Sequence, residues 1–259
     1  MPRLSSSAFF SAMPVFRRPE FAAACGRDPG DRAVTELLKY HLRAGNIRRI
    51  ARGVFATAGA IDRFLAASRL RIGAVIAYRS ALELHGCAVT PTSEVQLIAW
   101  GEPGLVRAGD FTCRFVSFPN HRSPGEAVTA MDRNGLAVSV TTLERTLVDL
   151  FDRYDLAGGA EDLFRSLDIV VEREVALDIE ALLEFAQRLD NATAAAALGY
   201  WLDCVRHRLG VTAAAVQALR ALAPRHIRYG LGATPGHGRV ATGWNVILPI
   251  DVVERYFDD

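Results

Sequence analysis

The sequence predicts an α+β protein, and two observations predict this class. Apolar residues recur at helical spacing in the first 60 residues and again from Ala160 to Leu222. Between these regions, short runs of β-branched and aromatic residues are bounded by Gly, Pro and Asn, as is typical of strands. The 259 residues are enough for two domains. We expect a first domain over residues 1–60 and a larger mixed domain over residues 61–259, with a small β-sheet and a helical subregion.

The first domain begins with two short predicted helices. Ser7 to Met13 forms the first, and Pro19 to Cys25 forms the second, which has its proline in the first turn and Gly26 as its stop. A longer helix is predicted from Asp31 to Ala44, where Asp31 is the N-cap. Apolar side chains fall on one side of this helix and polar side chains on the other.

A short basic hairpin follows the third helix directly. Gly45 and Asn46 supply the left-handed residues that end a helix, and Ile47 to Phe55 turns at Gly53. Helix, turn, longer helix and basic hairpin is the order of a winged helix-turn-helix. The sequence therefore predicts this fold for residues 1–60.

The chemistry of double-stranded DNA makes the third helix and the hairpin candidate contacts. A helix fits the major groove and reaches base edges, while arginines of a hairpin can bind phosphates along the backbone. We predict seven contact residues: Arg32, Thr35, Lys39, Arg43, Arg48, Arg49 and Arg52. Glu36 either accepts from a cytosine amino group or pairs with Lys39. A solvated helix face in an arginine-rich chain is the alternative explanation.

Charge is distributed unevenly along the chain, although the net charge is only +1. Residues 1–60 hold ten basic and four acidic side chains, a net charge of +6, and the remainder holds twenty basic and twenty-five acidic ones, a net charge of −5. A basic head on an acidic body is typical of nucleic-acid binding at one end and another task at the other.

The predicted body contains a sheet followed by helices. Helical patterns cover residues 61–75 and 78–86, and strand patterns cover residues 94–100, 111–118 and 136–140. Thr141 to Glu144 reads as a capping box that opens a helix, on whose surface Arg145 and Asp149 are expected to pair. Helices are expected from Ala160 to Leu222, and short strands near residues 229–231 and 246–248, with Trp244 in the core.

Cysteines and histidines are scattered, so we expect neither a metal site nor a cofactor. Cys25, Cys87, Cys113 and Cys204 show no C-x-x-C spacing and are expected to be buried small hydrophobes. His85 is expected to end a helix rather than to act in catalysis. No apolar run reaches the length of a membrane span and no signal-peptide block is visible, so we expect a cytoplasmic protein.

Three segments, in this order, resemble the AbiEi-type antitoxins of abortive-infection (type IV) toxin–antitoxin systems. They are GNIRRIARGVF at residues 45–55, SALELHG at residues 80–86 and VSVTTLERTLVDL at residues 138–150. The resemblance implies a winged helix that represses its own operon and a C-terminal domain that counteracts a nucleotidyltransferase-like toxin encoded next door. Arg48, Arg49 and Arg52 match the wing of the family, and Phe55 replaces a frequent tyrosine.

The resemblance also places Arg145 and Asp149 in the central signature of the family, in either a structural or a neutralising role. Two other functions stay open from the residues alone. A nuclease-like body could use Glu94, although such chemistry normally pairs an acid with a lysine at a metal, and Lys39 is the only lysine. A ligand-sensing transcription factor is the other alternative, although no phosphate-binding loop or cluster of polar groups marks a pocket.

Overall fold

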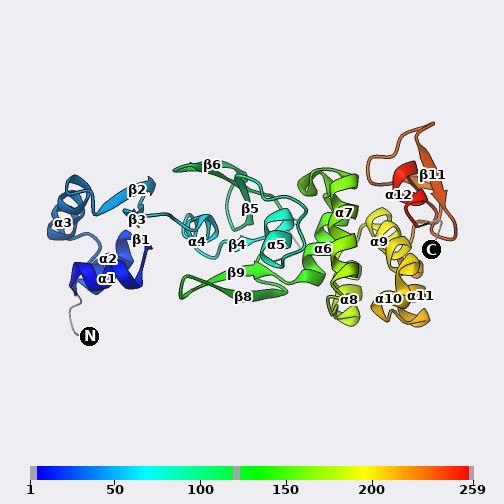
Figure 1. The fold of residues 1–259 in the computed structure, drawn as a ribbon, viewed down its shortest axis with the longest axis horizontal. Coiled ribbons are helices and arrows are strands. Elements are labelled where there is room, and N and C mark those ends of the chain that lie inside the picture. Colours follow the sequence, from blue (N-terminus) through cyan, green and yellow to red (C-terminus); the bar gives the residue numbers. More distant parts are fainter. Residues whose placement is uncertain (1–4, 119–122, 257–259) are drawn as a thin grey trace. The chain divides into compact units, whose positions relative to one another are not determined.

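The computed structural model describes residues 5–118 and 123–256. Within those residues it is an α+β protein with twelve α-helices and three β-sheets, which confirms the predicted class (Figure 1). The chain divides into two compact units, one of residues 1–76 and 92–140 and the other of residues 77–91 and 141–259. The boundary expected after residue 60, between a first domain and a larger mixed domain, stays a prediction.

The first unit contains four helices and nine strands among its described residues. In chain order they are α1 (Ser6–Ala12), β1 (Val15–Arg17), α2 (Arg18–Ala24), α3 (Arg32–Arg43), β2 (Ile47–Ala51), β3 (Val54–Thr57), α4 (Arg63–Ser68), β4 (Val75–Ile76), β5 (Glu94–Ile98), β6 (Gly104–Ala108), β7 (Phe111–Phe115), β8 (Val128–Arg133) and β9 (Leu136–Thr141).

The start of this unit follows the predicted caps and turns. Asp31 caps α3 by accepting a hydrogen bond from the amide of Ala33, and Gly45 after the helix has a φ of +70°. Gly53, with a φ of +76°, turns β2 into β3. The strand β1 was not predicted, and it pairs with β3 to give a three-stranded sheet in the order β1-β3-β2.

The larger sheet of the first unit has six strands in the order β6-β7-β5-β4-β9-β8. Its central strands are buried, as Val95, Ile76 and Val140 show with no exposed surface, and α4 packs on β4 and β5. The two edge strands, β6 and β8, were not predicted. Both are largely exposed, so their sequences lack the apolar alternation that marks a half-buried strand.

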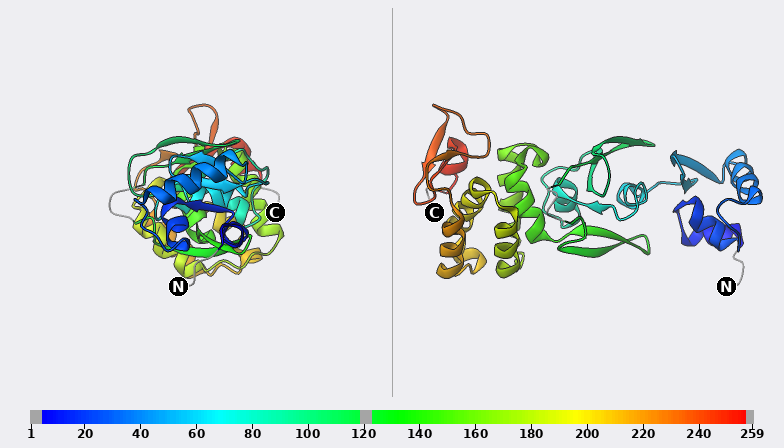
Figure 2. Two further views of the ribbon diagram at one scale, coloured as in Figure 1. Left: turned by 90° about the vertical axis from the view of Figure 1, so that its left-hand side faces the viewer. Right: turned by 180° about the vertical axis from the view of Figure 1, so that it is seen from behind.

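The second unit is mainly helical. Its elements are α5 (Tyr78–Leu84), α6 (Leu143–Asp152), the 3₁₀ helix η1 (Tyr154–Ala157), α7 (Ala160–Glu172), α8 (Ile179–Leu189), α9 (Ala192–Cys204), α10 (Arg206–Leu209), α11 (Ala213–Leu222), β10 (Arg228–Tyr229), β11 (Gly238–Ala241), β12 (Val246–Pro249) and α12 (Ile250–Glu254). The helix α6 packs against α5, α8 and α9, and α11 packs against α8 and α9 (Figure 2).

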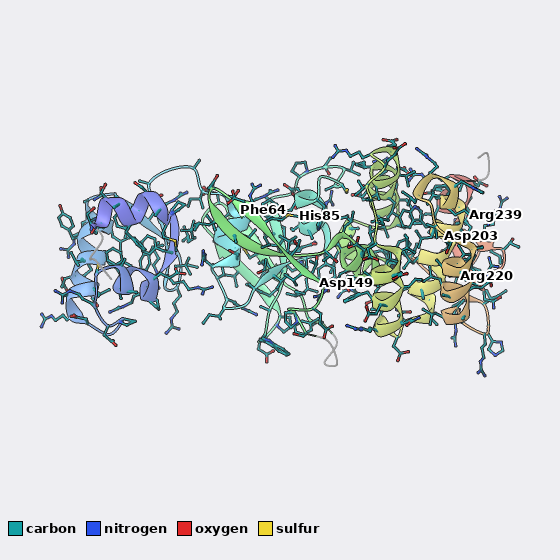
Figure 3. All side chains as sticks on the ribbon, turned by 90° about the horizontal axis from the view of Figure 1, so that it is seen from below. Phe64, His85, Asp149, Asp203, Arg220 and Arg239 are labelled. Atoms are coloured by element: carbon teal, nitrogen blue, oxygen red, sulfur yellow. The ribbon has the colours of Figure 1, made fainter. Side chains whose placement is uncertain are left out.

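The alanine-rich helix α9 carries the small C-terminal sheet, whose order is β10-β12-β11. A Cβ atom added at Gly199 of α9 would lie 2.1 Å from the ring of Trp244, so the glycine permits this close contact. Trp244 is 1% exposed, as predicted for a core aromatic, and the Arg220 guanidinium lies 4.9 Å from its ring centre. Arg220 also binds Asp203 of α9 at 3.0 Å (Figure 3).

The capping box predicted at Thr141 is wrong. Thr141 is the last residue of β9 and is fully buried, and Thr142 is the N-cap of α6, accepting a hydrogen bond from the amide of Arg145. The carboxylate of Glu144 instead accepts from the amide of Asp178, 3.1 Å away. The error arises because either of two adjacent threonines could cap the helix. The first of them, Thr141, belongs to the strand β9.

Two further findings concern membranes and cysteines. In the part of the chain that the structure describes, no helix is long and apolar enough to cross a membrane. Cys87 and Cys113 are buried as expected, whereas Cys25 and Cys204 are only partly buried, and all four are thiols rather than disulfides.

Candidate nucleic-acid interface

Helix α3 presents a charged face to solvent. Arg32, Lys39 and Arg43 are exposed, whereas Val34 and Leu38 on the opposite face are at most 4% exposed. This is the amphipathic arrangement that the sequence predicted. Packing of the buried face fixes the orientation of α3. The side chains of Arg32, Lys39 and Arg43 therefore project from a defined face of the helix.

A cluster of phenylalanines holds α3 in place. Phe9 contacts Phe16 and Phe21 edge-on, with ring centres 5.1 and 5.4 Å apart, and Phe10 stacks on Phe21 at 5.8 Å. Val34 and Leu38 of α3 belong to the same buried cluster. Burying each large apolar side chain stabilises the fold by roughly 1.5–3 kcal/mol, so these rings give the short first helices a substantial core.

His41 is the polar member of the buried face. The ring is 8% exposed, lies edge-on to Phe10 with centres 4.9 Å apart, and contacts the Asn46 side-chain amide 3.2 Å from its Nδ1. Burial lowers the pKa of His41 below its usual value. The neutral ring, whose Nδ1 accepts from Asn46, is therefore the favoured form in the folded protein.

Thr35 and Glu36, on the polar side of α3, both have partners within the protein. The Thr35 hydroxyl accepts a hydrogen bond of 2.7 Å from the guanidinium of Arg18, which also donates to the carbonyl of Pro29 at 2.6 Å. Arg18 thus ties α3 to the segment that precedes it, a role that sequence reasoning missed. Glu36 pairs with Lys39 at 2.9 Å, which is one of the two predicted alternatives.

The hairpin of β2 and β3 exposes three arginines. Ile47 and Ile50 are buried in β2, while Arg48 and Arg49 between them are exposed because the pairing register shifts after Arg49. Arg52 is exposed beside Gly53 at the turn. The guanidinium of Arg49 donates to the carbonyl of Ala51 at 3.2 Å, and Arg48 lies 3.9 Å from Asp110.

The acids of this region are engaged locally. Asp31 binds the Ala33 amide and Arg27, which together hold the pKa of its carboxyl below the usual range, and Glu20 binds Arg69 at 3.0 Å. Arg32, Arg43 and Arg52, by contrast, have no hydrogen-bond or ion-pair partner within the described residues. Their charges are therefore available for an anionic ligand.

Arg17 has a different role from the arginines of the hairpin. Its guanidinium is half-buried and donates to the carbonyls of Ser68, Arg69 and Arg71, at 3.4, 2.7 and 2.9 Å. These carbonyls lie at and beyond the end of α4, and that of Arg71 also accepts from the amide of Ala74. Arg17 thus links the N-terminal elements to α4.

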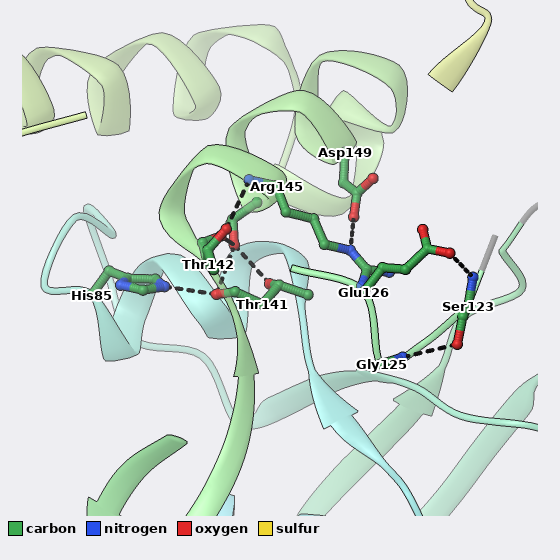
Figure 4. A network of polar contacts seen from close by, with 9 residues as sticks. His85, Ser123, Gly125, Glu126, Thr141, Thr142, Arg145 and Asp149 are labelled. Carbon is green, nitrogen blue, oxygen red and sulfur yellow. Dashed lines mark hydrogen bonds and ion pairs between the residues drawn. The ribbon is translucent and has the colours of Figure 1, made fainter. Parts of the chain in front are cut away.

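The Arg145–Asp149 pair of the second unit lies in the interior and not, as predicted, on the surface of α6. Arg145 is 1% and Asp149 5% exposed, and Arg145 Nε donates to Asp149 Oδ2 at 3.2 Å (Figure 4). The guanidinium also lies 5.3 Å from the ring centre of Phe185. Spacing of i, i+4 predicted the pair but gave no information about its burial.

Thr141, the last residue of β9, takes part in a network of hydrogen bonds within the second unit. His85, which follows α5 as its C-cap, contacts the Thr141 carbonyl at 2.8 Å through Nε2 (Figure 4). The hydroxyls of Thr141 and Thr146 lie 2.7 Å apart. His85 therefore ends a helix as predicted and contacts main chain.

Glu94, the acid of the nuclease alternative, binds the guanidinium of Arg114 through both carboxylate oxygens, at 2.8 and 2.9 Å. This bidentate pair occupies the carboxylate within the sheet. Within the described ranges, no group of three or more His, Cys, Asp and Glu side chains could hold a metal ion.

A cavity of about 500 Å³ in the second unit was not predicted from the sequence. Charged side chains of both signs line it, including Asp168, Arg208 and Arg255, together with Tyr256. Asp168 binds Arg255 at 3.1 Å, and burial raises the pKa of its carboxyl. These residues lie in or directly after helices that are far apart in the sequence, so residue spacing gave no signal of the cavity.

Comparison of the chain with models of known protein families and with curated proteins gave no match.

Proposed function

We propose that the protein is a DNA-binding transcriptional regulator whose N-terminal elements form a winged helix-turn-helix. The observation that supports this most directly is the element order α1-β1-α2-α3-β2-β3 with cations exposed on both α3 and the hairpin. In this arrangement a helix precedes a longer helix, and a hairpin follows. The longer helix can lie in a groove of DNA with the hairpin beside it.

In this proposal α3 enters the major groove of operator DNA. Arg32, Lys39 and Arg43 reach base edges or the groove walls, and Thr35 contributes through a hydroxyl that is already oriented by Arg18. Arg48, Arg49 and Arg52 bind phosphates through charge-assisted hydrogen bonds. The phosphate contacts give affinity and register, and the helix gives sequence preference.

We propose further that the protein is the antitoxin of a toxin–antitoxin pair and represses its own operon. This part rests on the resemblance to the AbiEi-type antitoxins, which implies a nucleotidyltransferase-like toxin encoded next door. The protein would act in the cytoplasm by binding rather than by catalysis. The burial of Arg145 and Asp149 supports a structural role for the central signature over direct neutralisation of the toxin.

The test is binding of the purified full-length protein to a duplex from upstream of its own gene, measured by fluorescence anisotropy against a scrambled duplex. The variant Arg48→Ala, Arg49→Ala, Arg52→Ala should lose the binding. A matched control replaces three exposed arginines of the second unit, Arg165, Arg188 and Arg206, and should bind as the wild type does. Equal affinity for the two duplexes, or equal losses in both triple variants, would refute the proposal.

The cavity at Asp168 favours a second candidate, in which the regulator senses a small polar molecule. This molecule would carry both charges, because acidic and basic side chains line the cavity. Thermal unfolding of the wild type and of Arg208→Ala, scanned against a panel of amino acids and other small zwitterions, tests it. A ligand that raises the midpoint only in the wild type would support sensing, and a panel without effect would count against it.

A further inference from the structure

Tyr40 is a large aromatic side chain on the exposed side of α3. It is 62% exposed, and its hydroxyl has no hydrogen-bond partner within the described residues. Glu36 lies four residues before it and Arg43 three residues after it, so both flank the ring on the helix surface. An uncharged ring is therefore placed among the charged side chains that α3 presents to solvent.

The Tyr40 ring is held in position without being part of the core. It lies outside the buried cluster of described residues that fixes α3. The ring is edge-on to His41, with ring centres 5.2 Å apart and planes inclined by 74°. His41 is in turn held by the ring of Phe10 and by the side-chain amide of Asn46. A tyrosine has only two side-chain torsions, so ordering it against a ligand costs little entropy.

The charges around the ring favour an anionic ligand. Glu36, the acid beside Tyr40, is paired with Lys39 at 2.9 Å, whereas Arg43 has no ion-pair partner within the described ranges. Cations of α3 and of the hairpin can bind phosphates of a duplex and so bring α3 to the groove. The apolar surface of Tyr40 then needs an apolar group on a base edge, and in the major groove this group is the 5-methyl of thymine.

We propose that Tyr40 is a specificity-determining residue that recognises a thymine of the operator through contact of its ring with the 5-methyl group. This proposal rests on the DNA-binding function proposed above. Cytosine has no methyl group at this position, so the contact distinguishes a T·A pair from a C·G pair. Because tyrosine carries no charge, the contact adds sequence preference without adding to the salt dependence of binding.

A protein surface is the other ligand that a tyrosine flanked by arginine could contact, because both residues are enriched in protein interfaces. The surroundings of Tyr40 favour a duplex. Residues 1–60 carry a net charge of +6, and the hairpin that follows α3 exposes three more arginines. A double helix of DNA offers a continuous row of negative charges that matches this distribution.

The experiment compares the duplex from upstream of the gene with the same duplex in which uracil replaces every thymine. This replacement removes the methyl groups and keeps the hydrogen-bonding groups of the base edges. Fluorescence anisotropy at one salt concentration measures the affinity of the full-length wild type and of Tyr40→Ala for both duplexes. The wild type should bind the thymine duplex at least about fivefold more tightly than the uracil duplex. Tyr40→Ala should bind the two duplexes equally within about twofold.

Two further variants identify the part of the side chain that acts. Tyr40→Phe keeps the ring and should keep the preference for thymine. Tyr229→Ala removes a tyrosine of similar exposure, 51%, from β10 of the second unit, and should also keep the preference. The same ratio of thymine to uracil affinity in the wild type and in Tyr40→Ala, or loss of the preference in Tyr40→Phe, would overturn the proposal.

The scrambled duplex separates this result from a failure of the regulator function. If the wild type prefers the upstream duplex to the scrambled one but does not distinguish thymine from uracil, the assignment of Tyr40 is wrong and the regulator function stands. If the wild type shows no preference for the upstream duplex, both proposals are wrong.

Discussion

Removing Asp149 should destabilise the protein far more than removing a surface acid at the same helical spacing. Arg145 is 1% exposed, and Asp149→Ala takes away the carboxylate that its Nε contacts at 3.2 Å. Removing one member of a buried, hydrogen-bonded ion pair costs about 3–5 kcal/mol. The free energy of unfolding of a folded domain is only about 5–15 kcal/mol. This single change should therefore remove a large part of the unfolding free energy of the second unit.

The assay is urea unfolding followed by tryptophan fluorescence, which reports on the second unit through the buried Trp201 and Trp244. The control is Glu161→Ala on α7, whose carboxylate pairs with Arg165 four residues later while both side chains are at least half-exposed. The control should lose no more than about 0.5 kcal/mol of unfolding free energy.

A double variant separates the buried charge from the packing. Arg145→Met with Asp149→Leu removes both charges at similar volume, and it should unfold within about 2 kcal/mol of the wild type, the difference including the contact of Arg145 with Phe185. If Asp149→Ala loses as little as Glu161→Ala, or if the double variant is less stable than the single one, the reasoning about the buried pair is refuted.

Two further predictions concern packing and pH. Gly199→Ala should lower the free energy of unfolding by roughly 1–3 kcal/mol, because the added methyl group would lie 2.1 Å from the Trp244 ring. The same change in an exposed helix is stabilising. A raised unfolding midpoint in urea would contradict this prediction. Burial lowers the pKa of His41 in the folded protein, so the unfolded protein binds a proton at this residue more readily. The free energy of unfolding should therefore fall as pH drops through the ordinary histidine pKa of about 6.5. Thermal unfolding from about pH 8 to about pH 5 should show a smaller loss in His41→Leu, and equal losses in both proteins would exclude His41 as the cause.

Local patterns in the sequence predicted the elements that are stabilised locally. The helix of residues 32–43 followed from its periodicity, the N-cap Asp31 and the glycine after it, all of which act within a few residues of one another. The edge strand of residues 128–133 was not predicted, because it is exposed and its sequence does not alternate between apolar and polar residues. Pairing with a neighbouring strand stabilises it.

Tertiary burial was the information that the sequence lacked. Arg145 and Asp149 have the spacing of a surface pair, and only the packing of α5, α8 and α9 around α6 places them inside. For the candidate interface, the arginines of the hairpin and the polar face of α3 were predicted. The contact of Arg18 with Thr35 spans seventeen residues and could not be read from either segment alone.

The salt dependence of operator binding tests the central claim most directly. Neutralising about five phosphates should make the logarithm of the association constant fall with the logarithm of salt concentration at a slope of roughly −4 to −5. Arg48→Ala, Arg49→Ala, Arg52→Ala removes three of those contacts and should make the slope shallower by roughly 2.7. A slope near zero for the wild type, or the same slope for the wild type and the triple variant, would contradict the assignment of these arginines to DNA.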